Sequence, residues 1–292
     1  MLWALFAGEL FGTSSIDVLL VVDHPRVEEK LILRELKSIG LRVGLLNPRV
    51  SPVQIGGFSA PAVSLVRTVS MFNGLRAAAA LESQDSHVVN SSYTIIACGD
   101  KAVGYAKLAS AGLPIPRTYL AFSMEAAAKA FEEVGGVAVD KPPVGSWGRM
   151  VSLVRSRRLL KYIAEAREEM SGSVRGHLIQ QYIETKGRDL RCLVVGDRVL
   201  GCVERVARGD WRSNVALGAS ARPHELSSEL EELALKAAEA VQGEFISVDF
   251  LVDSSTYVNE VNGTPEFKGF MAATGVNVAR KLAEHVKERL RA

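Results

Sequence analysis

A lysine followed by a loop of small residues ends one apolar run of the sequence. Lys141 is the last residue of this run, and Gly145, Ser146, Trp147 and Gly148 follow shortly after it. Small residues let backbone N–H groups approach phosphate oxygens, and the lysine adds a point charge, so the segment suits a triphosphate. It is not a Walker A loop, because the lysine precedes the glycines. Taken alone, the segment fits an ordinary surface loop equally well.

Two carboxylates and an amide lie in two apolar runs near the C-terminus. Alternation along a strand places Glu260 and Asn262 on one face and Asn259 on the other, and Asp249 on the preceding strand can point the same way as Glu260. Their oxygens form a ligand set suited to Mg²⁺ that bridges phosphates. The alternative is a pair of acids on a solvated sheet face. We favour the metal, because unpaired charge within apolar strands is costly.

Arginines are frequent between these two segments. Arg191 closes the stretch 184–191, and Arg205 and Asn214 lie in the stretch 204–214. Such arginines can clamp a phosphate or a substrate carboxylate through two parallel hydrogen bonds. Charge density alone would favour an ordinary solvated surface, so the interpretation depends on the other segments.

Composition narrows the classes of protein. The chain has 292 residues, 48% of them hydrophobic, and 35 Lys and Arg balance 33 Asp and Glu to a net charge of +2. This allows one large or two to three small domains, and it gives no electrostatic reason to expect nucleic acid or a membrane as partner. No run is long enough to span a bilayer, and the apolar start lacks the features of a signal peptide, so we expect a cytoplasmic protein. Cys98, Cys192 and Cys202 are expected to be buried, reduced thiols.

Periodicity divides the chain into three parts. The runs 16–22 and 41–46, joined by an amphipathic stretch that Pro25 opens, predict a small parallel sheet within residues 1–90. Helices are expected at 101–110 and 123–134, the latter with Ser123 as N-cap, and a strand at 137–141. From 177 the pattern is rich in strands, with a hairpin at Gly196-Asp197, a helix at 226–241 and a closing helix at 276–290.

Taken in order, these segments resemble the ATP-grasp superfamily. More narrowly, the segments 100–101, 180–184, 189–191, 209–214 and 259–262 resemble the RimK-type glutamate ligases. Within these the chain is most similar to the ligases that attach an amino acid to a LysW-type carrier protein in arginine and lysine biosynthesis. The resemblance covers about residues 16–290 and implies an α/β (α+β) ATP-grasp fold. Its implied parts are an N-terminal parallel pre-ATP-grasp sheet (1–90), a small ATP-grasp subdomain with the phosphate loop (91–175) and a large subdomain with the metal and substrate sites (176–292).

The resemblance also implies a role for each matching residue. Lys101 and Lys141 would contact ATP phosphates beneath the mobile loop of Gly145, Ser146, Trp147 and Gly148, and Gln180, Gln181, Tyr182 and Ile183 would form the hinge that binds adenine. Asp249, Glu260 and Asn262 would hold two Mg²⁺ ions. Arg191 would meet the transferred phosphate, while Arg205 and Asn214 would orient the reacting carboxylate and the incoming amino acid.

The implied reaction joins the terminal glutamate of a small acidic LysW-type carrier to the α-amine of glutamate or α-aminoadipate through an acyl phosphate. The substrate side chain would be sensed by Thr264, Glu266, Phe267 and Lys268, with Lys268 pairing its distal carboxylate. Gly269-Phe270 resembles the glutamate type, although one methylene is a small difference for a pocket. A basic surface of Arg149, Arg155, Arg157 and Arg158 could guide the carrier, or be an ordinary solvated run. Family members commonly form homodimers or tetramers.

Two other functions stay open at this point. One is a RimK-type ligase that adds glutamate to another protein tail or to a small cofactor. The other is an ATP-binding regulatory module without turnover. Both lysines and both metal carboxylates are present, which speaks against the regulatory module.

Overall fold

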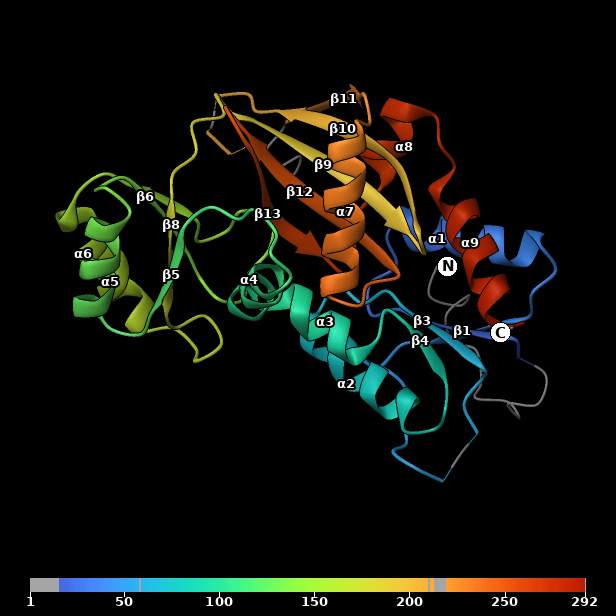
Figure 1. Ribbon diagram of the computed structural model, residues 1–292. Coiled ribbons are helices and arrows are strands. Elements are labelled where there is room, and N and C mark those ends of the chain that lie inside the picture. The colour runs from blue at the N-terminus through green and yellow to red at the C-terminus, as the bar shows by residue number, and fades with distance from the viewer. Residues whose placement is uncertain (1–15, 58, 210, 213–218, 292) are drawn as a thin grey trace.

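The computed structural model describes residues 16–57, 59–209, 211–212 and 219–291, and these residues form three sheets (Figure 1). The N-terminal sheet is parallel, in the order β2 (Val43–Leu46), β1 (Val18–Val21), β3 (Val63–Val66), β4 (His87–Val89). The helices α1 (Val27–Ser38) and α2 (Met71–Glu82) connect its strands. The parallel sheet expected within the first ninety residues is confirmed.

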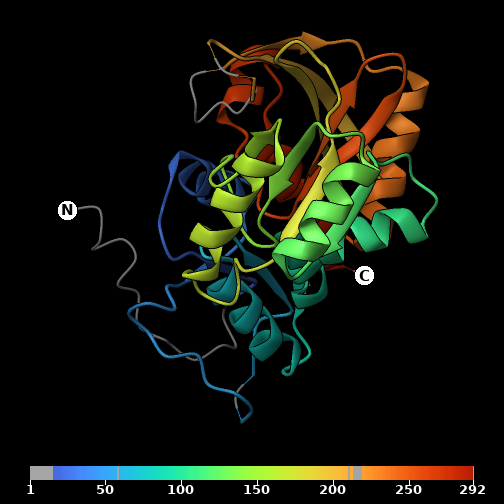
Figure 2. The same cartoon turned by 90° about the vertical axis from the view of Figure 1, so that its left-hand side faces the viewer.

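The small sheet is antiparallel and lies at one end of the molecule, facing the viewer in Figure 2. Its order is β5 (Thr118–Ala121), β8 (His177–Gln181), β6 (Ala138–Lys141), β7 (Ser152–Val154), with helices α5 (Met124–Glu133) and α6 (Arg157–Glu168). β8 pairs with both β5 and β6. The sequence-based boundary between 175 and 176 therefore cuts this sheet, because long-range pairing and not chain order decides which sheet a strand joins.

The large antiparallel sheet carries most of the chemistry expected from the sequence. Its order is β11 (Ser220–His224), β10 (Arg198–Val206), β9 (Arg188–Val195), β12 (Phe245–Val252), β13 (Thr256–Asn262). Helix α7 (Ser228–Ala240) packs on it, and α3 (Ser92–Gly99) and α4 (Lys101–Ser110) reach its β13 edge. The hairpin expected at Gly196-Asp197 joins β9 to β10.

The two C-terminal helices connect the N-terminal sheet with the large sheet. Helix α9 (Val278–Arg289) packs against α1 and β3, and α8 (Lys268–Thr274) packs against β10 and β11. One buried core therefore includes Leu20 and Leu65 from the N-terminal sheet, Phe245 from β12 and Leu282 from α9. Figure 1 shows the red α9 beside the blue α1, and α8 beside β10 and β11. The N-terminal sheet is thus built into the large subdomain.

Local signals account for the helix starts. Ser123 accepts a hydrogen bond from the Ala126 N–H, which confirms it as the N-cap of α5. The Ser91 hydroxyl caps α3 by accepting a hydrogen bond from the Thr94 N–H. Asp100 caps α4 in the same way and so fixes the position of Lys101 at its first residue. Within the described ranges, no helix has the length and apolar character needed to cross a membrane.

Two of the three cysteines form a disulfide, contrary to the sequence prediction. Cys192 on β9 and Cys202 on β10 lie directly opposite each other in the antiparallel register and are bonded. Cys98 is a free thiol, and its burial raises its pKa. The pairing could not be read from the sequence, because it depends on the register of the hairpin between the two strands.

Candidate active site

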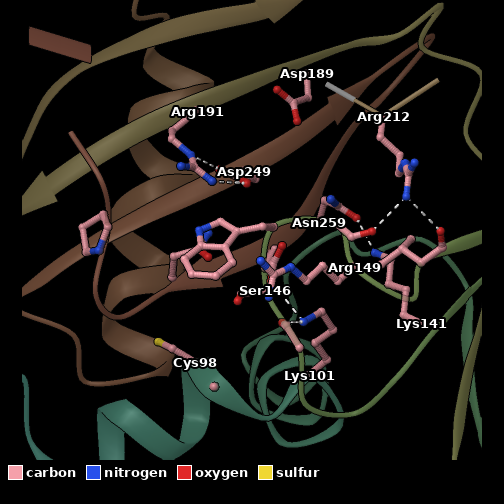
Figure 3. A pocket seen from close by; sticks show the side chains of 18 of the residues that line it. Cys98, Lys101, Lys141, Ser146, Arg149, Asp189, Arg191, Arg212, Asp249 and Asn259 are labelled. Atoms are coloured by element: carbon pink, nitrogen blue, oxygen red, sulfur yellow. Dashed lines mark hydrogen bonds and ion pairs between the residues drawn. The ribbon is translucent and has the colours of Figure 1, made fainter. Parts of the chain in front are cut away.

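A cavity of about 430 Å³ lies where the three sheets meet. The N-terminal sheet contributes Arg26 and Thr68, the small sheet contributes Lys141 and Gln180, and the large sheet contributes Asp249 among others. Figure 3 shows the labelled side chains converging on this space from several elements. The sequence segments from Lys101 to Asn262 that were expected to carry chemistry are therefore brought together among the described residues, although they lie far apart in the sequence.

The two expected phosphate lysines stand on the same side of the cavity. Lys101 Nζ donates to the Gly145 carbonyl at 2.5 Å and lies 3.3 Å from Glu260 Oε1. Lys141 Nζ donates to Asn259 Oδ1 at 2.9 Å and to the Tyr105 hydroxyl at 3.1 Å. Burial lowers the pKa of Lys141 to about 8, although the charges of Glu260 and Asp249 act to raise it. Both lysines are thus held in place as cations for an anionic ligand.

Asn259 is a site residue that the alternation rule placed on the wrong face. Asp249 pairs with Glu260, but the next residue, Phe250, pairs with Val258, so Asn259 is the extra residue of a β-bulge. The bulge turns Asn259 into the same cavity that Glu260 and Asn262 line. Strict alternation cannot reveal a bulge, and no glycine marks this one in the sequence.

The loop after β6 covers one wall of the cavity. Gly145, Ser146, Trp147 and Gly148 all line it, as expected for a loop over phosphates. Trp147 and Gly148 both have positive φ, of 58° and 70°. Arg212 Nη1 donates to the Gly148 carbonyl at 2.9 Å, which connects this loop to the segment after β10 (Figure 3).

The expected hinge residues Gln180, Gln181, Tyr182 and Ile183 also line the cavity. The Gln180 side chain is fixed by donating to the Thr118 hydroxyl at 2.9 Å, and the Gln181 N–H bonds the Arg117 carbonyl. The Tyr182 ring meets Trp211 edge to face, with ring centroids 6.2 Å apart. The Tyr182 and Ile183 side chains on the cavity wall suit contact with a flat aromatic ligand such as a purine.

The deepest part of the site is a chain of alternating charges. Arg191 binds Asp249 through two hydrogen bonds of 2.7 Å, and Figure 3 shows the two side chains facing each other. Arg205 donates to Asp189 at 2.6 and 2.5 Å and to Asp249 at 2.9 Å. Burial acts to raise the pKa of Asp249, but the charges and hydrogen bonds of Arg191 and Arg205 outweigh it and hold this pKa at about 2. Asp189 was not foreseen as part of the site.

The residues expected to hold Mg²⁺ fit that role by their chemistry. Asp249 and Glu260 are register partners on adjacent strands, and Asn262 lies two residues further along β13. The buried amide nitrogen of Asn262 has no hydrogen-bond partner among the described residues, so this amide is not committed to a structural bond at that atom. In the same described part of the chain, no group of three His, Cys, Asp or Glu side chains forms a metal cluster. Two carboxylates and one amide oxygen match the ligands that Mg²⁺ prefers when phosphates and water complete its shell.

The segment expected to sense the substrate is divided between the cavity and the core. Thr264 and Glu266 line the cavity. Phe267 is fully buried and packs edge to face on Phe245, and the exposed Lys268 begins α8. Neither Phe267 nor Lys268 lines the cavity. Lys268 is therefore not placed to pair with the distal carboxylate of an amino acid bound there. Asn214 lies outside the described residues.

The candidate basic surface is only partly continuous with the cavity. Arg149 lines the cavity and stacks on Trp147 at 4.8 Å from the ring centroid. Arg157 pairs with Glu132, and Arg158 lies over the Tyr162 ring. Arg155 is exposed. These side chains therefore mark one rim of the site and the helix α6 beside it.

Comparison with known proteins supports the same interpretation. A family model described as a RimK-like ATP-grasp domain matches residues 98–286. The chain is 44% identical over 279 residues to the glutamate–LysW ligase ArgX of Sulfurisphaera tokodaii, covering 93% of this chain and 98% of that one. It is 32% identical over 270 residues to the α-aminoadipate–LysW ligase LysX of Saccharolobus solfataricus, covering 90% and 98%.

Solved structures agree on the fold. A RimK domain ATP-grasp protein from Sphaerobacter thermophilus has a TM-score of 0.75 at 25% identity, covering 92% of this chain and 98% of that chain. The D-alanine–D-alanine ligase of Bacillus anthracis, solved with ATP, has a TM-score of 0.70 at 17% identity, covering 94% and 97%, and so shows the fold alone. The expected α/β ATP-grasp fold is confirmed, and the chain belongs to the RimK-like ATP-grasp family.

Proposed function

We propose that this chain uses ATP to join the α-amine of glutamate to the C-terminal glutamate carboxylate of a small acidic LysW-type carrier protein. One observation carries the proposal: the relative named as a glutamate–LysW ligase is 44% identical and is matched over 98% of its length. The geometry adds that the two lysines, the metal acids and the arginines of this family line one cavity. As a member of the family, the chain is an ATP-dependent carboxylate–amine ligase.

The chain's own residues account for phosphate binding. Lys101 and Lys141 would take ATP phosphates, and the loop 145–148 would close over them. Asp249, Glu260 and Asn262 would hold Mg²⁺, which when bound would offset the charge of the phosphates. We propose two such ions. Fixed cations around the transferred phosphoryl group are the main source of catalysis in phosphoryl transfer.

The reaction would proceed in two steps without a protein nucleophile. A carboxylate oxygen of the carrier forms a bond to the γ-phosphorus while the bond to the β,γ-bridging oxygen breaks, which releases ADP. The α-amine then attacks the acyl carbon, and phosphate leaves as the amine loses a proton. Arg191 and Arg205 sit where they could receive the acyl phosphate and the reacting carboxylate. Their tie to Asp249 keeps both guanidinium groups fixed before substrate arrives.

We propose glutamate over α-aminoadipate for two reasons. Gly269-Phe270 follows the substrate segment, and the relative named as a glutamate–LysW ligase is more similar to this chain than the one named as an α-aminoadipate–LysW ligase. Glycine at 269 leaves open space beside its Cα, and Phe270 is buried. A pocket distinguishes one methylene by about 1–3 kcal/mol, so we expect a preference for glutamate of at least about tenfold.

The test is ADP release by the purified protein with MgATP, glutamate and a carrier that ends in glutamate. Release should require both carrier and amino acid, and intact mass should show one added glutamyl residue on the carrier. A carrier without its terminal glutamate is the matched control. Absence of the adduct with glutamate and with α-aminoadipate would refute the proposal. An adduct on an unrelated protein tail but not on the carrier would favour the broader RimK-type activity.

The assembly of the chain is part of the proposal. We expect a homodimer or tetramer in solution. Light scattering of the purified protein measures this directly, and a monomer at all concentrations would contradict it.

A further inference from the structure

A ring of charged contacts joins the N-terminal sheet to the segment that follows the metal strand. Arg67, at the end of β3, donates to Glu29 at 3.1 Å and to the Pro265 carbonyl at 2.8 Å. Glu29 in turn receives Arg26 through Nε at 3.1 Å and Nη2 at 2.8 Å. Arg26 Nη1 reaches Glu266 Oε1 at 3.4 Å, which closes the ring. The position of the substrate segment is therefore set by residues of the N-terminal sheet.

The ring has a buried base, formed by Arg67 and Glu29, and an open end at the cavity, formed by Arg26 and Glu266. The side chains of Arg67 and Glu29 are 1% and 0% exposed, so their contacts are fully desolvated. The side chains of Arg26 and Glu266 are 21% and 35% exposed, and both line the cavity. Their contact is also the longest of the ring. A ligand could displace this pair without disturbing the base.

The open end has the charge pattern of an amino-acid binding site. It presents a guanidinium nitrogen and a carboxylate oxygen side by side, with opposite charges. An α-amino acid carries a carboxylate and an ammonium on one carbon, so the two charge patterns are complementary. Exchange of one long ion pair for two charge-assisted hydrogen bonds is favourable in a partly desolvated site. Glu29 keeps Nε and Nη2 of Arg26 engaged, so Nη1 is the group presented to the ligand.

We infer that Arg26 binds the α-carboxylate of the incoming amino acid while Glu266 receives its α-ammonium. The inference rests on the proposed function and makes it more specific. It assigns the binding of the α-carboxylate and α-ammonium, which glutamate and α-aminoadipate share, and it leaves the recognition of side-chain length to other residues. Arg26 of the N-terminal sheet thus supplies a cation to the bound amino acid. Lys268 does not line the cavity and supplies none.

The experiment compares Arg26→Gln with the wild-type protein on three amines. Glutamate has both carboxylates, 4-aminobutyrate is glutamate without the α-carboxylate, and glutamine lacks the distal charge. The carrier and MgATP are held constant, and 4-aminobutyrate is followed as a substrate or, where it is not joined, as a competitor of glutamate. Arg26→Gln should lower kcat/KM for glutamate about 10- to 100-fold, the range of a lost charged hydrogen bond. It should leave kcat/KM or the inhibition constant for 4-aminobutyrate unchanged.

The controls separate binding from structure. Arg26 also holds Glu29, so a purely structural role would lower activity with glutamate and 4-aminobutyrate alike and would raise KM for ATP. Arg26→Lys keeps the charge and should recover part of the preference for glutamate over 4-aminobutyrate. Arg42→Gln removes an exposed arginine that pairs with Asp17 in the same sheet. It should change neither the ratio of kcat/KM for glutamate to 4-aminobutyrate nor that for glutamate to glutamine.

The outcomes are distinct. A wild-type protein that joins no amino acid to the carrier overturns the proposed function and the inference together. An active wild-type protein with an unchanged ratio of glutamate to 4-aminobutyrate in Arg26→Gln overturns the inference alone. The inference is also overturned if Arg26→Gln loses the preference for glutamate over glutamine but keeps the wild-type ratio of glutamate to 4-aminobutyrate. Arg26 would then bind the distal carboxylate.

Discussion

Lys141 Nζ donates to Asn259 Oδ1 at 2.9 Å, and this bond links the small sheet to the large sheet across the cavity. Lys141 ends β6, and Asn259 is the bulged residue of β13. The Tyr105 hydroxyl donates to the Asn259 carbonyl and accepts from Lys141 at 3.1 Å. Asn259 and Tyr105 therefore form a fixed cradle for the lysine expected to bind phosphate.

Asn259→Ala should weaken ATP use more than it weakens the fold. A hydrogen bond to a charged group contributes about 1.5–3 kcal/mol, so kcat/KM for ATP should fall about 10- to 100-fold. Tyr105→Phe should act through the same lysine, and the double variant should lose less than the two single losses combined. Initial rates against ATP concentration measure this. Asn277→Ala removes a helix cap far from the cavity and is the control; equal losses in both variants would exclude a role for Asn259.

The site could be predicted from the sequence where a local pattern marks a residue, and not where its place depends on long-range pairing. Lys141 was predicted from the loop of small residues that follows it. Asp249 and Glu260 were predicted because charged residues within apolar runs are costly unless they have a partner. Asn259 was missed because a bulge breaks the alternation on which the prediction rested. Phe267 was misplaced because nothing local shows that the segment turns this ring into the core.

The same distinction holds for the fold. The apolar runs predicted the strands near 18–21 and 138–141, since burial on both faces requires continuous apolar sequence. The membership of β8 in the small sheet and the Cys192–Cys202 bond both depend on partners distant in sequence or on register. The contribution of Arg26 to the cavity arises from the packing of the N-terminal sheet against the C-terminal helices, which no local pattern encodes.

ATP binding should take up a proton above pH 8. Burial lowers the pKa of Lys141 to about 8, so the lysine loses its proton in the free protein as pH rises through this value. Bound phosphate stabilises the protonated form and raises the pKa again, so binding near pH 8.5 must recover the proton. Calorimetry of ATP binding in two buffers with different ionisation enthalpies gives the number of protons taken up. Lys141→Met should abolish the uptake, and uptake that persists in this variant would assign it to another group.

Removal of Arg205 should destabilise the protein strongly. Its loss leaves Asp189 and part of Asp249 buried beside fewer cations, and the loss of one partner of a buried ion pair typically costs about 3–5 kcal/mol. Urea unfolding of Arg205→Leu should therefore show a lower free energy of unfolding by about 3 kcal/mol. Arg222→Leu removes the exposed partner of Glu204 on the adjacent strand and should cost less than about 1 kcal/mol. Similar costs in both variants would show that the buried chain of charges is not needed for stability.

Glu244 should make stability depend on pH below neutrality. It binds His285 and His87, each at 2.7 Å, and Arg289 at 2.7 Å, and so connects α9 to the ends of β4 and β12. Burial acts to raise its pKa, but the hydrogen bond from His285, the charge of His87 and the contact with Arg289 outweigh it and lower this pKa to about 2.

The direction of the effect follows from the lowered pKa. The unfolded chain binds a proton at Glu244 near pH 4.5, whereas the folded protein binds it near pH 2. The stabilisation is therefore complete above about pH 5 and is lost as the pH falls from there towards 2. After allowance for partial exposure we expect a contribution of the order of 2 kcal/mol.

The measurement compares Glu244→Gln with the wild-type protein. Between pH 6 and pH 3 the free energy of unfolding of Glu244→Gln should fall by about 2 kcal/mol less than that of the wild-type protein. Glu288→Gln, at an exposed position of the same helix, should keep the wild-type slope. A wild-type slope in Glu244→Gln would mean that other acids cause the pH dependence.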